Sequence, residues 1–288
     1  MKKSFTKSRG RPFKGCQACA TIAESFNEED IDAIADLLPK VAKNSRRIVG
    51  TLSFPVCSRK ECHGALRDNS DITAEIIRQR RPGLLLCAGW SVPSKQTLGP
   101  VKKATQESQT VAVLETSAPE RAYFRIEDGE SFEMGKQLIR DSKQIDTDES
   151  CLTCLASNLP WRSFAFSNRQ ILLLICGEVT VIGGRDRVDF RSSATPPNLH
   201  DAVRAERVLI LNPTHTRMGN AGTLQAWRRF LSEAERVYVS ASNWDVGAKK
   251  VQHPSKTLHS VWHSGKCKEP ISITNRPGFS YREWELPQ

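Results

Sequence analysis

The stretch Gln170-Ile-Leu-Leu-Leu-Ile-Cys-Gly-Glu178 contains the longest apolar run of the chain, from Ile171 to Cys176. A short run of branched aliphatic residues predicts a strand that is covered on both faces. It is far too short to cross a membrane. The strand is expected to end at Cys176, where α/β proteins place reactive groups, and Gly177 allows a sharp turn after it.

Strands and helices alternate on both sides of this stretch, which predicts an α/β protein with a mixed sheet. Asp128-Gly129 predicts a hairpin turn between strands at 122–127 and 131–135. Residues 140–160 are polar and are expected to form a loop. Further strands are expected at 46–56, 84–88, 110–114, 163–166, 208–211 and 237–242, helices at 71–80, 100–109, 199–206 and 224–235, and short strands and loops in the last 45 residues.

The chain divides into three parts by composition. Residues 1–20 are basic and polar and are expected to be disordered. Residues 21–45 are expected to form a helical extension, and residues 46–288 are expected to form the main domain. The net charge is +10, and residues 1–15 carry six Lys or Arg and no acid. A broad nucleic-acid surface on the domain is therefore not required, although the tail, with Arg9-Gly10-Arg11-Pro12, is a candidate for weak nucleic-acid contact. A simple solubilising tail is the alternative.

The overall composition is that of an ordinary globular protein. Hydrophobic residues make up 39% and charged residues 26% of its 288 residues. No apolar segment follows the basic N-terminus, so a secretory signal and a membrane partner are not expected. The nine cysteines are then mostly reduced thiols, and the expected location is the cytoplasm.

The stretch 170–178 resembles the nucleophile strand of the nitrilase superfamily, the carbon–nitrogen hydrolases. Other stretches follow in the order of that family, and the similarity covers about residues 46–265. The other stretches are 46–55, 82–93 (PGLLLCAGWSVP), 122–136, 208–215 (VLILNPTH) and 227–245. Residues 46–288 are therefore expected to form a domain that resembles the carbon–nitrogen hydrolases.

The resemblance implies a four-layer α-β-β-α sandwich with mixed sheets and a homodimer. It also implies hydrolysis of a non-peptide C–N bond in a small amide or nitrile, without a metal or another cofactor. A Glu–Lys–Cys set would form a thioester: the thiolate attacks carbon, the glutamate moves protons, and the lysine with a backbone N–H stabilises negative charge.

The family's catalytic residues match this chain unevenly. Cys176 matches the nucleophile, and Lys136 matches the lysine, with Lys143 as the fallback. The segment after the second strand, residues 87–90, has no acid where the family has its glutamate. Either Glu115, at the end of the next strand, has taken over this role, or the protein is a catalytically degenerate binding or regulatory protein.

Four further residues are candidates for substrate binding. Gly177 leaves a backbone N–H for a carbonyl oxygen, and Glu178 is placed to orient the lysine or contact substrate. Thr214 and His215 follow a strand that is expected to end near the same cleft. For each of these, a purely structural role is the competing interpretation.

Paired cysteines suggest two competing sites. Cys16 and Cys19 with Cys57 and either Cys62 or His63 have zinc-like spacing, and Cys151 and Cys154 have the spacing of a redox pair. The gap from Cys19 to Cys57 is long and irregular, and nothing around Cys151 and Cys154 resembles a thioredoxin-like unit, so no metal or redox cofactor is expected.

Overall fold

A computed structural model describes residues 48–56, 69–79, 83–92, 95–116, 121–215, 221–245, 258–276 and 278–287. The predicted tail (1–20), the helical extension (21–45) and the zinc-like cysteines lie outside these residues. Within them the chain has the expected mixed α/β fold, because parallel and antiparallel strands share the same sheets.

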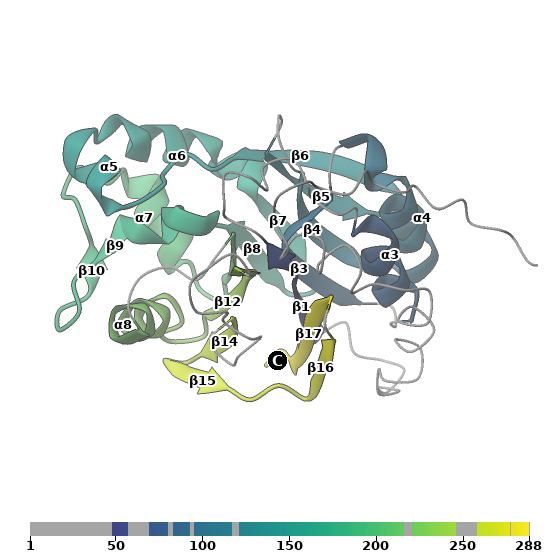
Figure 1. Ribbon diagram of the computed structural model, residues 1–288. Helices are drawn as coiled ribbons and strands as arrows, with labels where there is room; N and C mark the ends of the chain where they lie inside the picture. Colours follow the sequence, from purple (N-terminus) through teal and green to yellow (C-terminus); the bar gives the residue numbers. More distant parts are fainter. Residues whose placement is uncertain are drawn as a thin grey trace, which may run out of the picture.

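The larger sheet has seven strands in the order β16-β17-β1-β3-β4-β5-β6 (Figure 1). Its central strands β1, β3 and β4 are parallel, and the strands at both edges are antiparallel. The strands are β1 (Ile48–Ser53), β3 (Leu84–Val92), β4 (Val111–Thr116), β5 (Ala122–Glu127), β6 (Glu130–Lys136), β16 (Ser272–Arg276) and β17 (Phe279–Glu285).

The second sheet has six strands in the order β15-β14-β12-β11-β8-β7. Strands β8, β11 and β12 are parallel, and the outer strands are antiparallel. The strands are β7 (Ser163–Phe166), β8 (Arg169–Leu173), β11 (Leu209–Thr214), β12 (Val237–Ser242), β14 (His259–His263) and β15 (Lys266–Lys268). Two small ladders pair β2 (Pro55–Val56) with β13 (Trp244–Asp245) and β9 (Ile182–Gly183) with β10 (Asp189–Phe190).

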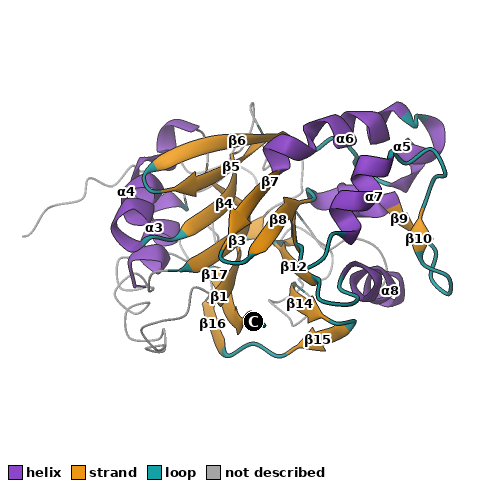
Figure 2. Ribbon diagram, turned by 180° about the vertical axis from the view of Figure 1, so that it is seen from behind, coloured by secondary structure: helices purple, strands orange, loops and turns teal. Residues whose placement is uncertain are grey.

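The helices lie in two groups, which Figures 1 and 2 show on opposite sides of the strands. One group shares a core cluster with strands of the larger sheet, and the other shares a cluster with strands of the smaller sheet. The first group is α3 (Ser70–Gln79) and α4 (Gly99–Ser108), and the second is α5 (Ser142–Thr147), α6 (Ser150–Arg162), α7 (Pro197–Arg204) and α8 (Ala221–Leu231). Two short 3₁₀ turns are η2 (Lys95–Leu98) and η3 (Cys176–Val181).

A third apolar cluster contains side chains from both sheets. Val49 and Val113 of the larger sheet share it with Ile171, Leu211 and Val239 of the smaller one. The inner faces of the two sheets therefore pack against each other. This packing also brings the last residues of parallel strands from both sheets into one region.

A buried histidine adds a polar link between the two sheets. His259 of β14 is 2% exposed, and its ring bonds Thr51 of β1 at 2.7 Å and Ser280 of β17 at 2.9 Å. Burial, and then the charge of Arg282, hold the pKa of His259 well below 6.5. The neutral ring can donate through one nitrogen and accept through the other, as these two hydroxyls require.

Most expected elements are found within two residues of their predicted ends, but two expectations were wrong. Residues 140–160 contain helices α5 and α6 rather than a loop, and α6 buries Leu152, Leu155 and Leu159 on one face. The strand expected to reach Cys176 ends at Leu173. The expected hairpin at Asp128-Gly129 is confirmed, with both residues at positive φ (50° and 80°).

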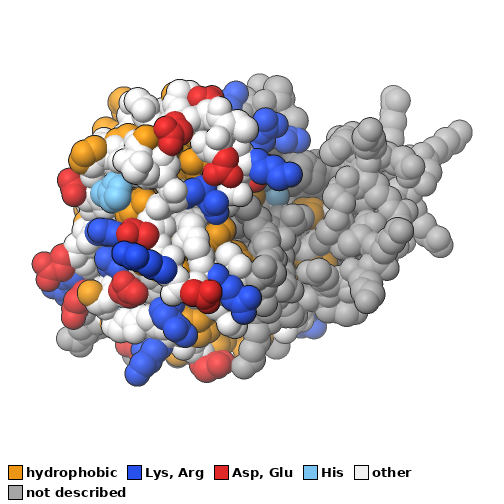
Figure 3. Space-filling model, turned by 90° about the vertical axis from the view of Figure 1, so that its left-hand side faces the viewer, with side chains coloured by type: hydrophobic (Ala, Val, Ile, Leu, Met, Phe, Trp, Pro, Cys, Tyr) orange, Lys and Arg blue, Asp and Glu red, His pale blue; other side chains and the backbone are white. Residues whose placement is uncertain are grey.

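The surface mixes charges of both signs. Figure 3 shows Lys and Arg interspersed with Asp and Glu on the face that lies to the left in Figure 1. None of the described helices has the length and apolar character needed to pass through a bilayer.

Candidate active site

The candidate site lies where strands of the two sheets end. Glu115 is the penultimate residue of β4 in the larger sheet, and His215 directly follows β11 in the smaller sheet. Cys176 lies three residues beyond β8, at the start of η3. Because β8 and β11 are neighbouring parallel strands, their carboxyl ends meet at one edge, the usual position of sites in α/β proteins.

Cys176 has a strained backbone. Its φ is 44°, in the left-handed region that residues other than Gly, Asn and Asp rarely adopt. It is 8% exposed, and its thiol is free of any disulfide. Strain of this kind costs about 1–3 kcal/mol and persists only where surrounding contacts hold it.

Asn212 of β11 holds the chain on one side of Cys176. Its Nδ2 donates to the carbonyl oxygens of Leu174 (2.6 Å) and Cys176 (3.1 Å), while its Oδ1 accepts from the Tyr238 hydroxyl at 2.7 Å. The carboxamide is thus fully used in fixing the two peptide groups that flank the turn.

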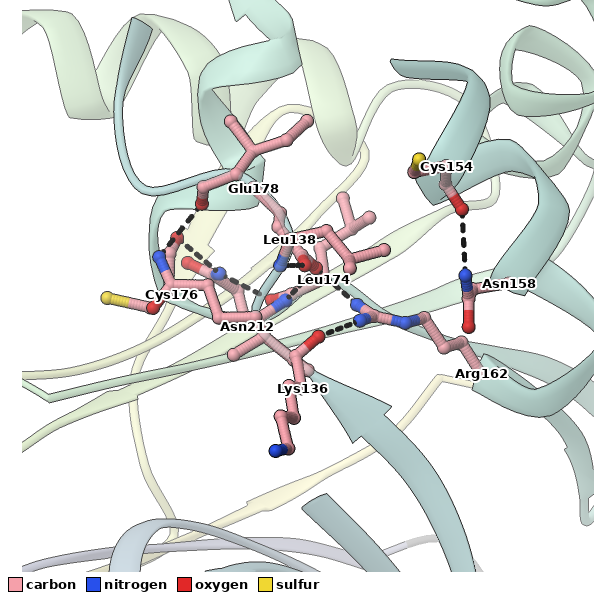
Figure 4. A network of polar contacts seen from close by, with 12 residues as sticks. Lys136, Leu138, Cys154, Asn158, Arg162, Leu174, Cys176, Glu178 and Asn212 are labelled. Atoms are coloured by element: carbon pink, nitrogen blue, oxygen red, sulfur yellow. Dashed lines mark hydrogen bonds and ion pairs between the residues drawn. The ribbon is translucent and has the colours of Figure 1, made fainter. Parts of the chain in front are cut away.

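Glu178 holds the same turn from the other side (Figure 4). Its carboxylate accepts from the N–H groups of Ile175 and Leu138, each at 2.7 Å, and forms an ion pair with Arg162. Both charged side chains are fully buried. Burial raises the pKa of Glu178, and the charge of Arg162 and the backbone hydrogen bonds oppose this shift.

Arg162, at the end of α6, connects this brace to the hairpin. One of its guanidinium nitrogens binds Glu178, and the other donates to the carbonyl oxygen of Lys136. Glu178 is therefore a buried structural residue that holds the cysteine turn, rather than a residue open to substrate. The pair ties the end of β6, the segment at Leu138 and the cysteine turn together.

Gly177 is required by a close approach of two backbone segments. A Cβ placed there would lie 1.9 Å from the carbonyl oxygen of Arg140, which is rigid backbone. Gly177 is also fixed by Thr180, whose hydroxyl donates to its carbonyl oxygen at 2.7 Å.

We expect Gly177→Ala to lower the free energy of unfolding by about 1–3 kcal/mol, as overpacking does, and to slow alkylation of Cys176 by moving its turn. Gly99→Ala is the matched control, because nothing lies within 4 Å of a Cβ at Gly99. Urea unfolding and the rate of reaction with iodoacetamide measure the two effects. Equal behaviour of the two variants would contradict the expectation.

A buried carboxylate and an imidazole meet beside Cys176. Nε2 of His215 lies 2.9 Å from Oε1 and 2.7 Å from Oε2 of Glu115. The Glu115 side chain is 2% exposed, whereas His215 is 30% exposed. Glu115 is therefore not a surface acid at a strand end, whereas His215 is partly accessible to solvent.

The same imidazole is hydrogen-bonded to the Cys176 thiol. Burial lowers the pKa of His215, but the hydrogen bonds and charges of Cys176 and Glu115 outweigh burial and raise the pKa from 6.5 to about 10. The ring is therefore an imidazolium at neutral pH. An imidazolium beside a cysteine stabilises the thiolate, which is the nucleophilic form.

No protein-family model matches the sequence, and a search of curated proteins found no match.

The structure gives two residues that the sequence placed at the site surroundings of their own. The side chain of Lys136 is exposed, and Figure 4 shows it running away from the guanidinium that its own carbonyl binds. The Thr214 hydroxyl is buried and bonded to Ser242 and to the carbonyl oxygen of Ala241. The fallback Lys143 is an exposed residue of α5.

Three residues at the site were not predicted from the sequence. Tyr123, directly across from Glu115 on β5, donates its hydroxyl to Oε2 at 3.1 Å. Asn212 and Arg162 fix the cysteine turn. Tyr123 could have been predicted from the sequence, because residues that pair across two antiparallel strands lie side by side. That prediction would have needed the register between β4 and β5, which pairs Tyr123 with Glu115.

The described residues hold no metal-ligand cluster of three or more His, Cys, Asp or Glu. Cys151 is buried and Cys154 exposed, both as free thiols of α6. Burial, followed by the charge of Asp148, raises the pKa of Cys151, which is the opposite of the shift that activates a redox cysteine.

Proposed function

We propose that this chain hydrolyses a non-peptide C–N bond of a small amide or nitrile through a thioester on Cys176. The observation that carries the proposal is the contact of one imidazole, His215, with both the Cys176 thiol and the Glu115 carboxylate. Nucleophile, base and orienting carboxylate in hydrogen-bond contact form the pattern of an activated cysteine.

The proposed reaction with an amide proceeds in two steps. The Cys176 thiolate attacks the carbonyl carbon, and the N–H of Gly177 is a donor for the developing oxyanion. The imidazolium of His215 gives its proton to the leaving nitrogen, the C–N bond breaks and a thioester forms. Neutral His215 then takes a proton from water as it attacks the thioester, which releases the acid and restores the thiolate and imidazolium.

Glu115 supports this cycle without reaching the substrate. Its carboxylate orients the imidazole and stabilises the imidazolium, as a buried carboxylate does in other triads. This role differs from the one that the resemblance implies, in which a glutamate is itself the base and a lysine supplies the positive charge. The cationic partner of the cysteine is here proposed to be His215 in place of Lys136.

The nitrilase-superfamily assignment is part of the same proposal. It is supported by the order of the similar stretches along the sequence, and by two mixed sheets whose inner faces share a core while separate helix groups pack with each sheet. We propose that this packing is the family's four-layer α-β-β-α sandwich. We likewise propose that the protein forms the homodimer that the resemblance implies.

The test combines product release with labelling of the thiol. The protein is incubated with a panel of small primary amides and nitriles while ammonia is measured, and separately with iodoacetamide followed by peptide mass analysis. Cys176→Ser should lower ammonia release by at least about 10²-fold and abolish the adduct at that position. Cys267→Ser, which removes an exposed thiol on β15, should leave both unchanged.

Two outcomes would count against hydrolysis. Ammonia release that survives Cys176→Ser would remove the nucleophile. An adduct at Cys176 without ammonia release from any amide or nitrile would favour the alternative, a binding or regulatory protein that keeps a reactive thiol.

A further inference from the structure

We infer that Tyr123 is a positioning residue: its hydroxyl fixes the Glu115 carboxylate in the orientation that keeps His215 against Cys176. The inference rests on the proposed role of Cys176 and extends it by one residue, away from the substrate. Tyr123 lies too deep to contact substrate, since it is 0% exposed.

The strands dictate this contact. Glu115 and Tyr123 are directly opposite each other in the antiparallel pair of β4 and β5, so both side chains leave the sheet on the same face. This is the inner face, because Tyr123 belongs to the cluster that both sheets share. A buried tyrosine hydroxyl needs a hydrogen-bond partner, and Glu115 is within reach at 3.1 Å.

The carboxylate needs a second anchor besides the histidine. Both of its oxygens are within 2.9 Å of Nε2 of His215. If the carboxylate of Glu115 rotated about its Cγ–Cδ bond, the imidazole would therefore have to move to keep these contacts. The Tyr123 hydroxyl binds Oε2 from the sheet side and opposes that rotation. A hydrogen-bonded partner behind the group that orients an imidazole is a recurrent means of fixing ring orientation.

Tyr123 keeps its proton in this position. Burial, followed by the charge of Glu115, raises its pKa well above 10, and the nearby Cys176 acts in the same direction. The hydroxyl therefore remains a donor over the whole range in which the site would work. It holds the carboxylate but does not supply a proton to the reaction.

The molecule contains a matched control for this contact. Tyr281 of β17 is also 0% exposed, and its hydroxyl also donates to a buried carboxylate, that of Glu283. It belongs to the cluster formed with α3 and α4, on the opposite face of the same sheet. Tyr281→Phe therefore removes the same kind of contact without touching the cysteine side.

The experiment measures the rate of Cys176 alkylation by iodoacetamide as a function of pH, by peptide mass analysis, well below the melting temperature of each variant. In Tyr123→Phe we expect the midpoint of the rise in alkylation rate with pH to move upward by about one pH unit, because a less firmly held imidazolium stabilises the thiolate less. At the pH of the wild-type midpoint, this shift lowers the alkylation rate by about fivefold. In Tyr281→Phe the midpoint stays at the wild-type value.

A double-substitution cycle tests whether Tyr123 acts through Glu115. Adding Tyr123→Phe to Glu115→Gln should cause no further shift of the midpoint, because the group that Tyr123 holds has already lost its charge. Full additivity of the two shifts would overturn the inference, as would a wild-type midpoint in Tyr123→Phe. A wild-type Cys176 that reacts no faster than Cys267 would instead overturn the proposed function itself.

Discussion

Replacing Arg162 by Met is expected to lower the free energy of unfolding by about 3–5 kcal/mol, because it leaves the buried Glu178 carboxylate without its cation. Both members of the pair are 0% exposed, so water cannot take over the missing role. For a domain of this size the melting temperature should fall by roughly 10 °C. The substitution also frees the carbonyl oxygen of Lys136, so the end of β6 loses its tie to the cysteine turn.

Two variants make this expectation specific to the buried pair. Arg204→Met breaks the exposed ion pair between Arg204 and Asp189 (2.7 Å) and should cost less than about 1 kcal/mol. The double variant Arg162→Met/Glu178→Met should regain part of the loss, since no charge is then left unpaired. Urea unfolding at neutral pH measures all three. A loss for Arg162→Met no larger than that for Arg204→Met would show that the pair does not brace the fold.

Replacing His215 by Ala should reduce ammonia release from an accepted amide by about 10²–10⁴-fold, the usual effect of losing a general acid–base group. It should also move the rise in the alkylation rate of Cys176 with pH to higher pH, because the thiolate is no longer stabilised by the imidazolium of His215. In the wild type the pKa of His215 lies near 10, so the imidazolium beside Cys176 is lost only as the pH rises toward 10.

The sign of this pH dependence also applies to stability. The pKa of His215 is raised on folding from 6.5 to about 10. Its contribution to stability is therefore complete below about pH 6.5 and is lost as the pH rises through about 10. Comparing the unfolding of the wild type and His215→Ala over this range should show the two curves converging at alkaline pH.

Lys136→Ala tests whether His215 or Lys136 is the cation that activates Cys176. With an exposed side chain at the end of β6, Lys136 should affect alkylation far less than His215 does. A large loss in Lys136→Ala together with a wild-type rate in His215→Ala would restore the lysine to the role that the resemblance implies.

The sequence predicts the strands well because their signal is local. Apolar runs such as Ile171 to Ile175 are buried on both faces, and Asp-Gly allows the two positive φ values of a tight hairpin turn. The helix α6 was missed because its polar surface and Pro160 are typical of a loop. Its burial comes from three leucines that contact other elements.

The candidate site was predictable only in part, because its contacts join distant parts of the chain. Cys176 is marked by the end of an apolar strand. The contact of Glu115 with His215 spans 100 residues and depends on how one sheet packs on the other. The choice of Lys136 came from its position after the Asp128-Gly129 hairpin, and the sequence could not show that its side chain is exposed at the end of β6.

The residues of the site come from two sheets and are therefore synthesised at different times. Glu115 and Tyr123 leave the ribosome well before Cys176 and His215, and β17, which pairs with β1 in the larger sheet, follows all of the other described strands. A nascent chain therefore carries its thiol for some time without the carboxylate held in place beside the histidine. In the proposed mechanism, Cys176 meets both of its partners only after the two sheets have packed together, because Glu115 belongs to one sheet and His215 follows a strand of the other.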